Sequence, residues 1–122
     1  MIKIREYLDA GGRNEYRTWF DGLDVAAATK VTVALERIAA DNTSSLKPVG
    51  EGVSEYKIDF GPGYRIYFGK DGDRLVILLG GGTKKRQNQD IEDAKAAWRE
   101  YKQVKKQAEA KTVAKSKTRK RK

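Results

Sequence analysis

Apolar and polar residues alternate at the beginning of the chain. In residues 2–8, Ile2 and Ile4 share one face of an extended backbone, while Lys3 and Arg5 share the other. A period of two residues is the pattern of a strand. The chain is therefore predicted to open with a strand, which the following pair of glycines ends.

Two amphipathic helices are predicted next. The first starts near Arg13 and ends near Gly22, and the second covers residues 25–40 with Asp24 as its N-cap. In each, apolar residues recur at offsets of three and four, which is the spacing of one helix face. The two apolar stripes consist of Tyr16, Trp19, Phe20 and Leu23, and of Ala28, Val31, Leu35 and Ile38.

Three strands that turn back on one another are predicted over residues 53–60, 64–68 and 75–79. The connections between them have hairpin length, so neighbouring strands should pair antiparallel. The third strand is a continuous apolar run, which is typical of a central strand covered on both faces. Residues 41–52 collect turn-forming residues and are predicted to be a loop. The glycines at 80–82 are predicted to end the third strand where backbones pack closely.

A final helix is predicted after the third strand, with Asn88 or Asp90 as its N-cap. Residues 105–122 have no apolar face to bury, so they are predicted to be a basic, disordered tail on a single domain of residues 1–104. The apolar stripe of this helix consists of Ile91, Ala94, Trp98 and Tyr101.

The predicted order is β-α-α-β-β-β-α, and the fold class is therefore α+β. We expect a small two-layer domain that contains an antiparallel sheet, an N-terminal helical hairpin and a C-terminal helix. The first strand should occupy an open edge of the sheet, and the helices should cover one of its faces.

Charge is concentrated at the C-terminal end of the chain. The 122 residues carry a net charge of +9, yet ten Lys and Arg residues and one acid, Glu109, lie from Lys102 onward. The preceding part is thus close to neutral. A basic tail of this kind favours salt-dependent attraction to polyanions without specifying a target.

Several classes of protein are excluded or disfavoured by composition. The chain has no cysteine and no histidine, which excludes disulfides, thiol catalysis and the common zinc sites. No apolar run approaches the length of a signal peptide core or a membrane span. We therefore expect a cytoplasmic protein without a membrane partner, metal or cofactor.

The candidate chemistry is cationic. Arg65 lies on the second strand of the hairpin, and Lys84, Lys85 and Arg86 lead into the last helix, followed by Gln87. A guanidinium presents a planar fork to a phosphate, and the N-terminus of a helix attracts anions. This pattern favours the binding of a phosphate backbone.

The sequences PGYRIYF and LLGGGTKKRQNQDI resemble the RelE/ParE superfamily of toxins, and more narrowly the phage Gp49-like or HigB-like addiction module killer protein group. The resemblance covers residues 1 to about 103. It implies the toxin of a type II toxin–antitoxin system. In RelE-like members the activity is metal-independent cleavage of mRNA, commonly at the ribosome. The alternatives are a ParE-like inhibitor of DNA gyrase without nuclease chemistry and a catalytically inactive antitoxin-binding module.

The resemblance also implies roles for single residues. Arg65 matches the arginine that lies at the phosphate, and Lys84, Lys85 or Arg86 matches a second basic group. A lysine of the RelE-type site is replaced by Asp59, and a tyrosine near the start of the last helix has no counterpart. The general base is therefore open, with Asp59 or the hydroxyl of Tyr67 as candidates. Gln87 is expected to contact nucleic acid together with the cations.

The expected partners follow from the same resemblance. They are a cognate helix-turn-helix antitoxin, mRNA and the ribosome, and operator DNA reached only through the antitoxin. The nuclease hypothesis requires Arg65 and the Lys84–Arg86 cluster to lie on one patch. It also requires that Arg65 is not held in an internal ion pair with Glu55 or Asp59.

Overall fold

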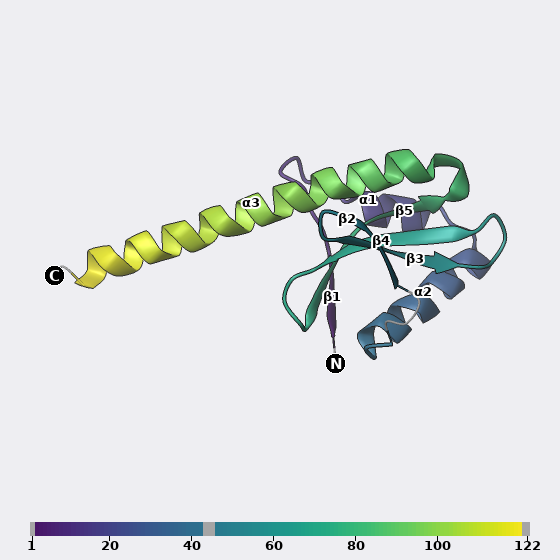
Figure 1. Ribbon diagram of the computed structural model, residues 1–122, viewed down its shortest axis with the longest axis horizontal. Helices are drawn as coiled ribbons and strands as arrows, with labels where there is room; N and C mark the ends of the chain where they lie inside the picture. The colour runs from purple at the N-terminus through teal and green to yellow at the C-terminus, as the bar shows by residue number, and fades with distance from the viewer. Residues whose placement is uncertain (1, 43–45, 121–122) are drawn as a thin grey trace.

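The computed structural model describes residues 2–42 and 46–120, with side chains to residue 110. Three helices, one short 3-10 helix and five strands make up the described chain (Figure 1). Their bounds are Lys3–Glu6 for β1, Glu15–Asp21 for α1, Val25–Ala39 for α2, Leu46–Gly50 for β2, Val53–Ile58 for β3, Tyr64–Lys70 for β4, Leu75–Thr83 for β5, Lys84–Arg86 for the 3-10 helix η1 and Gln87–Lys120 for α3. None of these helices is long and apolar enough to cross a membrane.

A five-stranded sheet in the order β1-β5-β4-β3-β2 forms the centre of the domain. The strands β2 to β5 pair antiparallel, whereas β1 lies parallel to β5 with Lys3 opposite Leu75. The α+β fold class and the edge position of the first strand are thus confirmed. The orientation of β1 corrects the prediction of a purely antiparallel sheet. A parallel pair needs a long crossover, and the helices and hairpins between β1 and β5 supply it.

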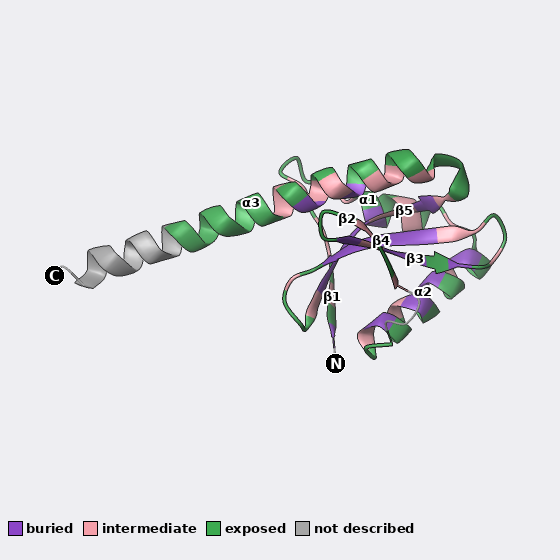
Figure 2. Ribbon diagram, in the orientation of Figure 1, coloured by how far each residue is buried: buried purple, intermediate pink, exposed green. Residues whose placement is uncertain are grey.

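Helices cover both faces of the sheet. On one face, α1 and α2 pack over a cluster that includes Val31 and Ile66. On the other, α3 packs over a cluster that includes Tyr67 and Trp98. Figures 1 and 2 show the buried strands between α3 on one side and α2 on the other. This packing corrects the two-layer prediction, because the apolar residues of β5 face both ways and both sets need a cover.

One strand was not predicted. The segment 41–52 was expected to be a loop, but its second half contains β2, an edge strand with an irregular register near Pro48. Proline lacks a donor for the sheet and is tolerated at an edge. The tight turn into β3 explains the glycines here, because Gly50, Glu51 and Gly52 all have positive φ.

The glycines at 80–82 do not end β5 but remain paired with β4. Close packing, the other part of the prediction, is confirmed at two of them. A Cβ at Gly81 would lie 2.3 Å from the ring of Trp19, and one at Gly82 would lie 2.1 Å from an oxygen of Asp90. The ring of Trp19 from α1 and the carboxylate of Asp90 from α3 therefore occupy the space that a side chain at Gly81 or Gly82 would need.

The last helix begins earlier and ends later than predicted. The chain passes through η1 directly into α3 at Gln87, so neither Asn88 nor Asp90 is an N-cap. The predicted stripe is confirmed, because Ala94 and Trp98 are buried under the helix. The helix continues to Lys120 and projects beyond the sheet (Figure 1). Residues 102–110 of the helix are exposed.

Candidate functional site

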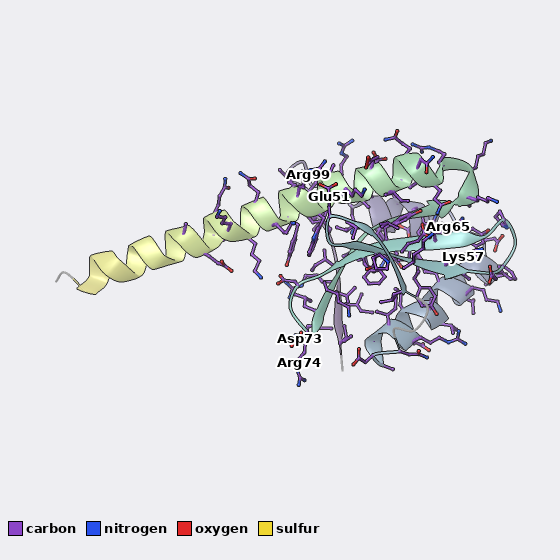
Figure 3. The ribbon with its side chains drawn as sticks, viewed as in Figure 1. Glu51, Lys57, Arg65, Asp73, Arg74 and Arg99 are labelled. Carbon is purple, nitrogen blue, oxygen red and sulfur yellow. The ribbon has the colours of Figure 1, made fainter. Side chains whose placement is uncertain are left out.

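Arg65 lies on β4, and its cross-strand partners on the two neighbouring strands differ greatly in size. Its partner on β3 is Lys57, and its partner on β5 is Gly82. At this end of the sheet Arg65 lines an open hollow of about 310 Å³, the Arg65 hollow, together with Lys57, Asp59, residues 60–63 and Lys84. Figure 3 shows Lys57 and Arg65 on adjacent strands at this end of the sheet. The sheet register therefore brings cations from three segments to one place.

The guanidinium of Arg65 is held mostly from inside the protein. Its side chain is only 6% exposed, and its Nε lies 3.7 Å from Oε1 of the equally buried Glu55. Nη1 donates a hydrogen bond of 3.3 Å to the carbonyl of Gly63. The second carboxylate oxygen of Glu55 accepts a hydrogen bond of 2.9 Å from Nε2 of Gln87. Glu55 thus connects β4 to the first residue of α3.

These contacts decide the two conditions of the nuclease hypothesis. Arg65 and Lys84 share one hollow, but Lys85 and Arg86 do not line it, so the first condition is met by Lys84 alone. However, Arg65 is engaged in an internal ion pair with Glu55, so the second condition is not met and the hypothesis cannot rest on Arg65 as a free guanidinium. Glu55 offsets the charge of Arg65, so most of the uncompensated charge that an anion meets in the hollow comes from the exposed Lys84.

Tyr67 is fully buried beneath α3, next to Glu55 across the β3–β4 pair. Its hydroxyl has no hydrogen-bond partner in the described part of the chain. Burial raises the pKa of this hydroxyl, and the Glu55 carboxylate raises it further. A phenol in these surroundings stays protonated at neutral pH, so the structure does not support Tyr67 as a general base.

Asp59 lies at the rim of the Arg65 hollow. Its side chain is 89% exposed, and Oδ1 lies 3.4 Å from Nζ of Lys57. It is the carboxylate among the residues that line this hollow, and Arg65 makes its ion pair with Glu55 instead. Asp59 is therefore placed where it can meet a bound substrate, which Tyr67 is not.

The cationic cluster of η1 does not act as one group. Lys84 lines the Arg65 hollow, whereas Arg86 lines a separate hollow beside Asp90 and Asp93 of α3. Lys85 is exposed and lines neither of the two. Gln87, expected at the nucleic acid, instead fixes Glu55.

Sequence reasoning did not identify Lys57 as part of the site, and it named Glu55 only as a possible partner of Arg65. The alternation of the two strands contains a signal for this face of the sheet, because Glu55 and Lys57 lie two residues apart in β3, as Arg65 and Tyr67 do in β4. Only the register of the hairpin shows which residue faces which. That register depends on the turn at residues 59–63.

The electrostatics of the Arg65 hollow suit the binding of an anion. Its lining contains three cations and one carboxylate, and the buried Glu55 lies behind it. In the part of the chain with described side chains, no group of three or more carboxylates is placed to hold a metal ion. What the described residues offer is fixed positive charge from Arg65 and Lys84 and an exposed carboxylate at Asp59.

Residues 18–102 match the model of a family described as phage-derived protein Gp49-like (DUF891). The chain belongs to this Gp49-like family. The family is associated with toxin–antitoxin modules. The Gp49-like match includes the whole Arg65 hollow and ends where α3 leaves the sheet. An uncharacterized protein of Haemophilus influenzae is 37% identical to this chain over 81 residues, which cover 66% of this chain and 82% of that protein.

Proposed function

We propose that this protein is the toxin of a type II toxin–antitoxin pair and that it cleaves RNA at the Arg65 hollow without a metal. The observation that carries the proposal is the exposed Lys84 on one hollow with the ion pair of Lys57 and Asp59. Membership of a family associated with toxin–antitoxin modules supports the biological setting. The resemblance to RelE-like toxins supports RNA as the target.

In the proposed reaction, the 2′-oxygen of one nucleotide attacks the adjacent phosphorus and the bond from phosphorus to the 5′-oxygen breaks. Asp59 accepts the proton of the 2′-hydroxyl, and Lys57, 3.4 Å from it, donates a proton to the leaving oxygen. Lys84 stabilises the additional negative charge on the phosphate, and Arg65, already paired with Glu55, contributes less. The products are a 2′,3′-cyclic phosphate and a 5′-hydroxyl end.

A second candidate function is binding without chemistry. It is favoured by the ion pair of Arg65 with Glu55 and by the burial of Tyr67, which leave the hollow with less fixed charge and fewer proton carriers than the RelE pattern implies. A toxin that inhibits DNA gyrase by binding it belongs to this class. So does an inactive module that only binds its antitoxin.

The proposed protein partner is a helix-turn-helix antitoxin that covers the Arg65 hollow. Such a partner neutralises the toxin by denying RNA access to Lys84, and it carries the pair to operator DNA. An acidic segment is the chemistry that complements the exposed cations of the hollow.

The test is induction of the full chain in cells without an antitoxin, followed by mapping of RNA 5′ ends. We expect growth arrest with discrete new 5′-hydroxyl ends. Lys84→Gln should reduce cleavage by about 10²-fold, the scale for loss of one group that stabilises transition-state charge. The matched control is Lys85→Gln, which removes the same charge one residue away from the hollow and should retain cleavage.

Growth arrest with intact RNA and altered DNA supercoiling would overturn the nuclease proposal in favour of gyrase binding. Full growth of cells that contain the folded protein would support the inactive module. Equal effects of the Lys84 and Lys85 substitutions would show that the Arg65 hollow is not the site.

A further inference from the structure

A second cationic hollow lies where α3 leaves the sheet. It is about 250 Å³ in volume, and four lysines, Lys70 at the end of β4 and Lys102, Lys105 and Lys106 of α3, outnumber the two carboxylates of its lining, Asp71 and Glu109. We call it the lysine hollow. Its floor is the stacked pair of Trp98 and Tyr101, whose rings lie 5.0 Å apart and 5° from parallel. The Arg65 hollow lies at the other end of β4, about 17 Å away at the rise of a strand.

The charges of the lysine hollow are only partly compensated. Asp71 accepts hydrogen bonds from Lys105 and from the hydroxyl of Tyr101, which hold its pKa below the ordinary value. Within the described side chains, Lys70, Lys102 and Lys106 form no ion pair. Lys102 lies over the ring of Trp98, with Nζ 5.9 Å from the ring centroid. Three cations are therefore available to a ligand.

The cationic surface continues along the helix. Residues 102–110 are exposed, and in the sequence seven Lys or Arg residues without an acid follow from Lys111 onward. At 1.5 Å per residue, α3 is about 50 Å long, and roughly the second half of it projects beyond the domain (Figure 1). Like charges along one helix repel one another, and a polyanion relieves that repulsion.

We propose that the lysine hollow and the projecting part of α3 together bind the sugar–phosphate backbone of RNA, as an arm separate from the Arg65 hollow. Several phosphates spaced along one strand match a row of lysines on a straight helix, which a single small anion does not. A membrane surface fits less well, because the apolar side chains of residues 102–110 are one valine, Val104, and two alanines, too few to anchor the helix between lipids.

The arm binds without regard to base sequence, since Trp98 is buried and its stacked ring is not free to receive a base. It rests on the proposed function only for the choice of RNA as the polyanion. In the proposed function, the arm retains a long RNA while the Arg65 hollow, several nucleotides away along the strand, binds one phosphate.

The test uses the full chain and a fluorescent oligouridylate with 2′-O-methyl groups, which has no 2′-hydroxyl to attack. Binding is measured by anisotropy at several salt concentrations. In the double variant Lys102→Gln/Lys106→Gln we expect weaker binding and a slope of log K against log salt that is reduced by about 1.4, from 0.7 per phosphate contact on a single strand. The control double Arg37→Gln/Lys47→Gln removes two exposed cations of α2 and β2 and should leave the slope unchanged.

A third variant separates this proposal from the proposed function. Lys84→Gln should reduce cleavage of ordinary RNA by about 10²-fold yet keep most of the salt slope. If none of these variants changes cleavage but the salt slope falls in Lys102→Gln/Lys106→Gln as expected, the RNA arm is supported and the nuclease proposal fails. Equal slopes in the two double variants, or binding to phosphatidylserine vesicles without binding to the oligouridylate, would overturn the arm.

Discussion

At the scale of single residues, the carboxylate of Glu55 organises the Arg65 hollow. It lies between the guanidinium of Arg65 and the amide of Gln87, and all three come from different elements. A buried carboxylate is stable only when neighbours offset its charge. The same contacts that hold Arg65 in place therefore reduce the charge that it offers to a ligand.

Arg65→Ala should destabilise the protein by about 3–5 kcal/mol, because it leaves Glu55 buried without its cation. Urea denaturation measures this loss. The double variant Glu55→Gln/Arg65→Ala should regain part of it, since it removes the uncompensated charge as well. A single variant as stable as the wild type would contradict the buried pair. A loss of toxicity in Arg65→Ala is informative only when compared with this stability.

Asp90 supplies a prediction of pH dependence. Burial raises its pKa above the ordinary 3.8, the nearby Asp93 adds to this, and Arg86 opposes it. The folded state thus binds the proton more tightly than the unfolded chain. Above the folded pKa, the charged Asp90 therefore lowers the free energy of unfolding, and this loss of stability disappears as the pH falls through that pKa. Asp90→Asn should raise the urea midpoint at pH 7, and its advantage over the wild type should shrink in acid.

The control for this measurement is Glu92→Gln, which removes an exposed carboxylate of the same helix turn that is not among the charges raising the pKa of Asp90. It should change the midpoint less at neutral pH. An advantage of Asp90→Asn that grows as the pH falls would contradict the raised pKa.

At the scale of elements, β5 shows how one strand serves two layers. Its apolar residues contribute to both clusters, and its glycines admit Trp19 on one face and Asp90 on the other. Interiors packed to this density tolerate added atoms poorly. Gly81 and Gly82 are therefore held to glycine by the helices that cross β5.

Gly81→Ala should destabilise the protein by about 1–3 kcal/mol, the usual effect of overpacking, because its Cβ would lie 2.3 Å from the ring of Trp19. Gly80→Ala is the matched control, since nothing lies within 4 Å of a Cβ at that position. Thermal denaturation compares the two variants. Similar losses in both would show that Trp19 does not pack on β5 as described.

The elements that the sequence predicted best are those with local signals. Asp24 caps α2 by accepting a hydrogen bond of 2.8 Å from the backbone of Ala27, and the apolar run in β5 correctly indicated cover on both faces. β2 was not predicted because an edge strand that contains Pro48 resembles a loop in composition. The parallel pairing of β1 was not predicted because no local sequence pattern indicates the direction of a strand partner that is distant in sequence.

For the site, the sequence correctly brought Arg65 and Lys84 together, since both flank turns at the same end of the sheet. It could not choose between Glu55 and Asp59 as the partner of Arg65, because that choice depends on which residues face one another across the hairpin. It also treated Lys84, Lys85 and Arg86 as one cluster. The tight turn of η1 instead directs Lys84 and Arg86 to different hollows.

At the scale of the whole molecule, α3 both closes the domain and carries its excess charge. Its first half buries Ala94 and Trp98 and is joined to the β2–β3 turn by a 2.9 Å ion pair between Arg99 and Glu51 (Figure 3). Its continuation over residues 102–110 is exposed. Helical hydrogen bonds that lack tertiary cover open at lower free energy than those that are packed.

Hydrogen exchange should therefore divide α3. Amides between Ala94 and Trp98 should exchange slowly, close to the rate of global unfolding, whereas those of residues 103–110 should exchange faster by orders of magnitude. Addition of the oligouridylate should slow exchange in the exposed part if the RNA arm proposal holds. Uniform protection along the helix in the free protein would contradict the described burial.

The parallel pairing of β1 with β5 has a consequence for assembly. The first strand to be synthesised finds its partner only after nearly the whole sheet has been made. Its registration is a non-local contact of the kind that slows folding. A change within β1 should therefore act on one of the last steps of sheet completion, and leave the β3–β4 hairpin that carries Arg65 free to form first.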